Sequence, residues 1–295
     1  MNARANPVFC AEASSNHNGD LDRALALVDA AAMSAFDAVK FQLYRVDDLF
    51  SPEAQMAKPE LAARKAWQLP PEFIPALARR ARGHGLEFSC TPFSLDAVET
   101  IASHVDFLKI ASYELLWSDL LKACARTGLP VVLSTGMATE DEIDAAVLTL
   151  HSSGCEDLTL LHCVSAYPTP TAEANLAAIE TLHDHTGLPV GWSDHTNDSA
   201  VINRAVNRWG ASFIELHLDL DGQGAEFGPG HCWLPETAGP LIQSLRVGMK
   251  ADGHGRKEPA PSERHDRVWR ADPSDGLRPL LETRQRWRDG GPNQT

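Results

Sequence analysis

Several features that mark other protein classes are missing from this 295-residue chain, and each absence removes a class of function. No apolar run approaches the roughly 18 residues that a membrane helix needs. The first residues, MNARANPVFCAEASS, lack the apolar segment of a secretory signal. We therefore expect a cytoplasmic protein that does not contact a membrane.

Positive charge is also scarce, because 26 Lys and Arg residues oppose 40 Asp and Glu residues and leave a formal net charge of -14. Nucleic acids and anionic lipids carry charge of the same sign, so neither is an expected partner. No Gly-rich dinucleotide or Walker loop follows the first apolar run, which argues against a nucleotide cofactor. The six cysteines have no Cys-x-x-Cys spacing, and several lie in apolar runs, which favours reduced thiols in the core.

What the chain does contain is an eightfold alternation of two patterns. Short β-branched or apolar runs, typical of strands buried on both faces, cover residues 8–14, 38–44, 87–93, 107–113, 130–136, 158–164, 190–196 and 213–220. Helix-like stretches separate the runs, and Thr139 and Glu142 have the spacing of a capping box. The alternation predicts an α/β protein with a (β/α)8 TIM barrel.

The C-terminal end of the chain differs in composition from the residues before it. We expect the barrel over residues 1–254 and a short irregular tail, not an independent domain, over residues 255–295. The tail carries nine Lys and Arg against seven Asp and Glu, whereas the preceding residues are strongly acidic.

Within the barrel, the longest connection, residues 45–70, is polar and has three prolines. It predicts an inserted loop over one end of the barrel.

Polar side chains come late in each predicted strand, and in a barrel the carboxyl ends of the strands form the active site. The residues at these positions are Glu12, Ser14, Asn16, His17, Lys40, Gln42, Ser89, Thr91, Lys109, Ser112, Ser134, Thr135, Ser165, Tyr167, Ser193, His195, Glu215 and His217. Two lysines, many hydroxyls and two imidazoles together predict a site for an anion, in particular phosphate, beside a metal.

Each of these residues also has a structural interpretation. A lysine in a strand is usually a surface residue, but Lys40 and Lys109 lie between apolar neighbours, and burying an unpaired ammonium costs several kcal/mol. We interpret both as anion ligands. An isolated histidine is more often structural, whereas His195 and His217 lie on neighbouring strands beside acidic residues, which favours metal binding. The role of His162 stays open between the two.

Several ordered blocks of the sequence resemble the sialic acid synthase family. The blocks include AEASSNHNGD (11–20), DAVKFQLY (37–44), LKIASYE (108–114), LPVGWSDHT (188–196) and FIELHLDLD (213–221). The resemblance covers the whole predicted barrel, from residue 8 to about residue 246. It implies an enzyme, a transferase that condenses phosphoenolpyruvate with the aldehyde of an N-acylated hexosamine and releases phosphate and a 2-keto sugar acid.

The resemblance also implies roles for individual residues. His195 and His217 carry a divalent metal, Mn2+ or Mg2+, that binds the sugar aldehyde. Glu12 transfers protons, and Gln42 lies with it at the sugar end. The phosphoenolpyruvate ligands are Lys40, Thr91, Lys109, Ser112, Ser134, Tyr167 and Ser193, to which we add Ser165. A homodimer is implied as well.

Four departures from the family pattern concern the sugar side. The family carries a lysine at the position of Leu216, an acidic residue at Gly230 and an asparagine at Ser165, and it has a C-terminal antifreeze-like domain that residues 255–295 are too few to form. We therefore expect an acceptor other than N-acetylmannosamine. His231 or Glu226 is a candidate replacement for the missing acid, and a solvated loop is the alternative.

Two other functions remain open from the sequence. A metal-dependent carbon–carbon lyase or aldolase would use the same histidine pair without phosphoenolpyruvate. A catalytically silent barrel could serve as a subunit in a polysaccharide pathway, which the departures at Leu216 and Gly230 suggest.

Overall fold

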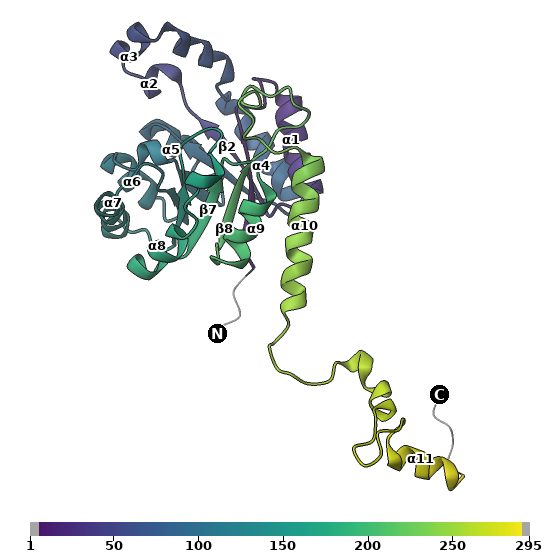
Figure 1. Ribbon diagram of the computed structural model, residues 1–295. Helices are drawn as coiled ribbons and strands as arrows, with labels where there is room; N and C mark the ends of the chain where they lie inside the picture. The colour runs from purple at the N-terminus through teal and green to yellow at the C-terminus, as the bar shows by residue number, and fades with distance from the viewer. Residues whose placement is uncertain (1–5, 291–295) are drawn as a thin grey trace. The chain divides into compact units, whose positions relative to one another are not determined.

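Eight parallel strands form a closed barrel in the computed structural model, which describes residues 6–290. Each strand pairs with the next along the chain, and the last pairs with the first (Figure 1). The strands are β1 (Val8–Ser14), β2 (Ala38–Leu43), β3 (Glu87–Pro92), β4 (Phe107–Ile110), β5 (Val131–Ser134), β6 (Leu158–Cys163), β7 (Val190–Asp194) and β8 (Phe213–His217). The predicted (β/α)8 barrel is confirmed.

The barrel interior is apolar at one end and polar at the other. An apolar cluster of interior side chains comprises Cys10, Ala38, Phe107, Val132, Leu161 and Phe213. Side chains alternate across a strand, so the residues two positions further along share the same face. On five of these six strands that step leads to a charged or hydroxyl side chain, namely Glu12, Lys40, Lys109, Ser134 and Glu215. The polar end therefore lies at the carboxyl ends of the strands.

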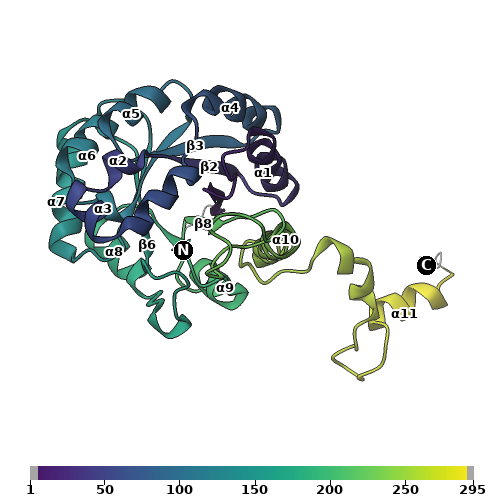
Figure 2. The same cartoon turned by 90° about the horizontal axis from the view of Figure 1, so that it is seen from above.

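Helices surround the barrel, as the view along it in Figure 2 shows. They are α1 (Leu21–Met33), α4 (Ile74–Gly83), α5 (Leu95–Ile101), α6 (Ser118–Ala125), α7 (Glu140–Ser152), α8 (Ala178–Thr186), α9 (Ser199–Asn207) and α10 (Pro235–Asp252). The predicted capping box is present at α7, where the Thr139 hydroxyl accepts from the Glu142 amide and the Glu142 carboxylate accepts from the Thr139 amide. Outward-facing strand residues such as Phe9, Phe41 and Trp192 join these helices in the main core.

The predicted insertion after β2 is built from short helical segments. They are α2 (Val46–Leu49), α3 (Pro52–Ala57) and the 3-10 segments η1 (Pro59–Trp67) and η2 (Pro71–Phe73). Figure 1 places α2 and α3 beyond one end of the barrel. Because this segment directly follows β2, that end is the carboxyl end, where the polar residues lie. Two further 3-10 turns, η3 (Ser112–Glu114) and η4 (Thr171–Glu173), follow β4 and β6.

The chain divides into two compact units, Met1–Ala251 and Asp252–Thr295. The second unit contains η5 (Pro261–Glu263), η6 (His265–Trp269) and α11 (Leu281–Arg288). Within it, the rings of Trp269 and Trp287 lie 5.6 Å apart. Residues 1–5, which begin the predicted barrel domain, and residues 291–295, which end the predicted tail, lie outside the described residues. Among residues 6–290, no helix combines the length and apolarity that crossing a membrane requires.

Candidate active site

The sequence-predicted site residues lie on the last positions of the strands or directly after them. They are Glu12, Lys40, Gln42, Thr91, Lys109, Ser112, Ser134, Ser165, Tyr167, Ser193, His195 and His217. Most of these side chains are buried, whereas Gln42, Ser112 and Ser165 are half-buried and Tyr167 is exposed. Their contacts divide them into two groups.

The first group, which we call the lysine half, consists of Glu12, Lys40, Lys109, Ser193 and Glu215. Lys40 forms a direct ion pair with Glu12, and its Nζ lies 3.4 Å from Glu215 Oε2. Lys109 Nζ lies 3.7 Å from Glu215 Oε1, which also accepts a hydrogen bond from the Ser193 hydroxyl at 2.8 Å. Two cations and two carboxylates thus neutralise one another inside the barrel.

The electrostatics of the lysine half favour the charged form of Glu215. Burial by itself raises the pKa of Glu215, but Lys109 and Lys40 more than offset this and lower that pKa to about 2. Burial lowers the pKa of Lys40, and the neighbouring Glu215 carboxylate opposes the change. The sequence indicates Glu215 only as one of many polar strand residues, yet it contacts both lysines.

Unpartnered hydroxyls accompany these charges. Thr91 Oγ1, Ser134 Oγ and Ser165 Oγ are buried without a hydrogen-bond partner among the described residues. Ser112 Oγ accepts from the Gly136 amide at 3.0 Å. A Cβ at Gly136 would clash with both Ser165 Oγ and Ser112 Oγ, so glycine lets the backbone approach these hydroxyls. Buried hydroxyl donors beside two lysines form a site that an anion can occupy.

The second group, which we call the imidazole half, consists of Tyr167, His195, His217, Glu226 and His231. The ring centroids of His195 and His217 lie 5.2 Å apart, and His217 and His231 lie 4.8 Å apart. The Tyr167 ring lies 4.2 Å from that of His195. Burial lowers the pKa of His195 to about 3 and that of His231 to about 4. The His195 and His231 imidazoles are therefore neutral at pH 7 and offer lone pairs.

Glu12 connects the two halves. In the sheet register, Glu12 pairs with Lys40 on β2 and with His217 on β8. Its Oε1 also accepts a hydrogen bond from the Ser14 amide at 2.6 Å. The carboxylate thus lies at the boundary between the lysines and the imidazoles. A group at this position can transfer a proton between molecules bound at the two halves.

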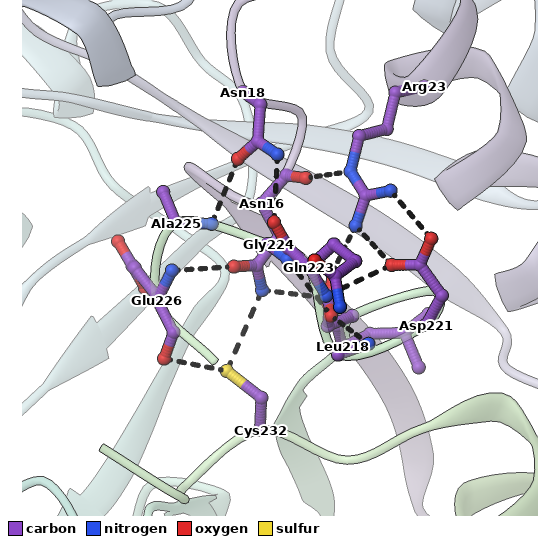
Figure 3. A network of polar contacts seen from close by, with 12 residues as sticks. Asn16, Asn18, Arg23, Leu218, Asp221, Gln223, Gly224, Ala225, Glu226 and Cys232 are labelled. Carbon is purple, nitrogen blue, oxygen red and sulfur yellow. Dashed lines mark hydrogen bonds and ion pairs between the residues drawn. The ribbon is translucent and has the colours of Figure 1, made fainter. Parts of the chain in front are cut away.

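Glu226 and His231 reach the site from the loop between β8 and α10, which polar contacts fasten to the loop after β1 (Figure 3). Asn16 Nδ2 donates to the Leu218 carbonyl, and Asn16 Oδ1 accepts from the Glu226 amide, both at 2.9 Å. Asn18 Oδ1 accepts from the Ala225 amide at 2.9 Å. The solvated-loop interpretation is wrong for His231, which is 3% exposed, while Glu226 is half-buried.

Two histidines and one leucine lie elsewhere. His162 Nε2 hydrogen-bonds the Ala174 carbonyl at 3.0 Å and its ring packs 5.2 Å from Trp192, which gives it a structural role. His17 Nδ1 accepts from the Gly19 amide at 2.9 Å. Leu216 is fully buried in the main core. It faces outward between the inward-facing Glu215 and His217, so placing its departure on the sugar side of the pocket was wrong.

Comparison with known proteins identifies the family. The NeuB family matches residues 27–257. The chain belongs to the NeuB family. An N,N'-diacetyllegionaminic acid synthase from Legionella pneumophila is 38% identical over 270 residues, or 86% of this chain and 75% of that protein. A pseudaminic acid synthase from Helicobacter pylori is 35% identical over 226 residues, or 73% of this chain and 66% of that protein.

A solved structure agrees with these NeuB-family relatives. The N-acetylneuraminic acid (sialic acid) synthetase from Leptospira borgpetersenii, in complex with citrate, superposes with a TM-score of 0.79. It is 34% identical, and the match covers 88% of this chain and 90% of that one. The predicted resemblance and the prediction of a sialic-acid-synthase-type enzyme, a transferase, are confirmed.

The imidazole half fits the divalent metal that the NeuB family implies. His195 Nδ1 hydrogen-bonds the Val164 carbonyl at 2.8 Å, which leaves Nε2 as the lone-pair nitrogen. Within residues 6–290, His217 Nδ1 has no hydrogen-bond partner, although Glu226 Oε2 lies 3.5 Å away. Donor atoms of His217, His231 and Cys232 lie within 4.8 Å of one another. Neutral imidazoles with a nearby carboxylate suit a divalent ion.

Proposed function

We propose that this chain condenses phosphoenolpyruvate with an aldose, related to an N-acylated hexosamine, to give a 2-keto sugar acid and phosphate. The observation that carries the proposal is the pairing of the two halves. A buried lysine pair with free hydroxyls suits an anionic phosphate ester, and the adjoining imidazoles suit a metal-bound aldehyde. The synthases named among its relatives support the same reaction class.

In this proposal the lysine half holds phosphoenolpyruvate. Lys40 and Lys109 exchange their carboxylate partners for the carboxylate and phosphate of the substrate, since an ammonium can shift between acceptors within a small radius. Thr91, Ser134 and Ser165 supply donors that have no other partner among the described residues. Ser112, Ser193 and Tyr167 complete the proposed ligand set.

The imidazole half holds the aldehyde. His195 and His217 are the proposed metal ligands, and the ion, when bound, supplies a Lewis acid for the aldehyde oxygen. Gln42, two residues beyond Lys40 on β2, is proposed to contact the sugar. The departures at Gly230 and Ser165 still favour an acceptor other than N-acetylmannosamine.

Proton transfer falls to Glu12. A bond forms between C3 of phosphoenolpyruvate and the aldehyde carbon as the C2–C3 and carbonyl π bonds break. The alkoxide formed takes up a proton, and water then adds at the electron-poor C2. Glu12, between Lys40 and His217 in the register, accepts the proton that this water loses. The C2–oxygen bond to phosphate breaks as the phosphohemiketal collapses, and the lysines and hydroxyls stabilise the departing anion.

An acceptor screen tests this proposal. Purified protein is incubated with phosphoenolpyruvate, Mn2+ and a panel of N-acylated hexosamines, other aldoses and short aldehydes, and phosphate and product mass are measured. We expect phosphate only in the presence of an acceptor, together with a product whose mass is the sum of the substrates plus water minus phosphoric acid. Lys109→Met is the matched inactive control. Absence of phosphate with every acceptor would instead favour the lyase or the catalytically silent barrel.

Assembly and location belong to the same proposal. We propose a cytoplasmic homodimer in which residues 1–254 form the synthase barrel and residues 255–295 a tail rather than an independent domain. Sedimentation analysis of the full chain tests the dimer.

A further inference from the structure

We infer that His231, from the loop between β8 and α10, is a third imidazole ligand of the metal site, beside His195 and His217. The resulting three-histidine site would select a first-row transition-metal ion over Mg2+. This inference rests on the metal site of the proposed function and adds a ligand and a metal class to it.

The first support is the position of the three rings. His231 lies closer to His217, at 4.8 Å between centroids, than His195 does, at 5.2 Å. His195 and His231 are 6.3 Å apart, so the three rings form a triangle. Metal–nitrogen bonds of about 2 Å draw ligand atoms to within about 4 Å of one another. Donor atoms of His217 and His231 already lie within 4.8 Å of one another.

The second support is the unused bonding capacity of His231. Its Nδ1 is buried and has no hydrogen-bond partner in the described part of the chain. Its Nε2 lies 4.0 Å from Glu226 Oε2, and its hydrogen bond to Cys232 Sγ, at 3.7 Å, involves a weak sulfur partner. Buried polar atoms in folded proteins normally have partners, and an orphaned one requires an explanation. A metal ion supplies that partner.

The third support is the way the loop is held. The Trp233 amide donates to the His217 carbonyl at 2.7 Å, and the Asp219 amide donates to the Trp233 carbonyl at 2.9 Å. These bonds close the loop at its base, so that His231, two residues before Trp233, stays beside His217. At the same base, Arg23 donates to the Asp219 carboxylate at 2.7 Å. A site built on a fastened loop can keep its ligand in place.

Gly230 contributes a backbone conformation. Its φ is +95°, which side-chain-bearing residues rarely adopt. Its carbonyl accepts from Asn197 Nδ2 at 3.2 Å, and Asn197 follows His195 by two residues. Gly230 stands where the family pattern has an acidic residue. Its backbone forms the turn that directs the next side chain, His231, toward the other two histidines.

Cys232 is the competing ligand because its sulfur belongs to the same cluster. Its thiol donates to the Glu226 carbonyl at 3.4 Å and accepts from Asn16 Nδ2 at 3.6 Å, so it already has partners in this loop and in the loop after β1. We therefore assign the third position to His231. Three imidazoles favour Mn2+, Co2+ or Zn2+ over Mg2+, which prefers oxygen ligands.

The experiment measures metal binding directly, without substrate. Full-length protein is freed of metal by chelation, and Mn2+ binding is followed by electron paramagnetic resonance and calorimetry. The variants are His231→Asn, His195→Asn, Cys232→Ser and, as an exposed control, His254→Asn. We expect His231→Asn and His195→Asn each to weaken Mn2+ binding at least tenfold, and Cys232→Ser and His254→Asn to change it less than twofold. Thermal unfolding of the metal-free variants establishes that each one folds.

The outcomes separate this inference from the proposed function. If His231→Asn binds Mn2+ as tightly as the unaltered protein while His195→Asn does not, His231 is not a ligand and the two-histidine site stands. If the unaltered protein and His195→Asn bind equally weakly, the metal site of the proposed function fails as well. In protein loaded with Co2+, a sulfur-to-cobalt charge-transfer band that Cys232→Ser abolishes would show that Cys232, and not His231, is the third ligand. Mg2+ binding as tight as Mn2+ binding would overturn the predicted metal class.

Discussion

The two halves of the site differ in how their buried polar groups are partnered. In the lysine half, Lys40, Lys109, Glu12 and Glu215 arrive on strands and pair with one another. In the imidazole half His195 and His231 are neutral, Glu226 and His231 come from one loop, and two ring nitrogens lack partners among residues 6–290. Charge in the first half therefore supports the fold as well as the chemistry. The free ring nitrogens of the second half contribute no hydrogen bond to the described fold and suit the proposed metal.

The largest expected effect comes from breaking the charge balance of the lysine half. Lys40→Met leaves Glu12 and Glu215 buried with less positive charge, and should lower the free energy of unfolding by about 3–5 kcal/mol. Urea denaturation measures it. The matched control is Lys65→Met, whose ion pair with Asp47 is exposed and should contribute less than about 1 kcal/mol. Equal losses in the two variants would mean that burial does not distinguish these pairs.

Glu114 sharpens the comparison, because it is a carboxylate beside the lysine half that lacks a close cation. Its Oε2 has no hydrogen-bond partner in the described chain, and burial raises its pKa to about 7. The unfolded state releases this proton near the ordinary glutamate pKa of 4.5, while the folded state retains it up to about pH 7. The free energy of unfolding therefore falls by about 3 kcal/mol as the pH rises from 4.5 to about 7, because the folded state must then ionise a buried carboxyl group.

Glu114→Gln removes this dependence. The difference in unfolding free energy between the variant and the unaltered protein should grow in favour of the variant from pH 4.5 to pH 7 and then level off. Denaturation at a series of pH values provides the curve, and exposed Glu99→Gln serves as the control. Parallel curves for Glu114→Gln and the unaltered protein would show that the Glu114 pKa is the same in the folded and unfolded states.

The difference between the halves also explains what the sequence could predict. Strand residues follow a period of two, so Glu12, Lys40 and Lys109 could be placed inside the barrel from the pattern alone. The same alternation, applied between Glu215 and His217, places Leu216 outside the barrel. The run at 107–113 was predicted as a strand, and β4 ends at Ile110 because the next residues turn into η3.

The loop residues could not be placed in this way. Glu226 and His231 have no periodic neighbours, and their position depends on contacts with Asn16 and Asn18, more than 200 positions earlier in the chain. The local signals were a glycine-rich segment and a histidine after it, which are equally typical of a solvated loop. Only the folded arrangement shows that this loop belongs to the site.

Gly224→Ala tests the dependence of the imidazole half on its loop. A Cβ at this position would clash with the Asn16 carboxamide and the Asp219 carboxylate. We expect a loss of about 1–3 kcal/mol in unfolding free energy, and weaker Mn2+ binding because the loop that carries His231 shifts. Gly228→Ala is the matched control, since a Cβ at Gly228 would have no described atom within 4 Å. Unchanged Mn2+ binding in Gly224→Ala would separate the loop from the metal site.

The smallest expected effect on stability lies within the lysine half itself, between two serines with different partners. Ser193 donates to Glu215, so Ser193→Ala removes a hydrogen bond to a buried charge and should reduce the unfolding free energy by about 1–3 kcal/mol. Ser134 Oγ has no partner among the described residues, so Ser134→Ala should change stability by less than about 0.5 kcal/mol.

If Ser134 donates to bound phosphoenolpyruvate, its loss raises KM for that substrate by roughly tenfold or more. Steady-state kinetics with denaturation of the same samples gives both quantities. A Ser134→Ala variant with unchanged KM would mean that its hydroxyl does not face the anion, and a strongly destabilised one would mean that the fold already uses it.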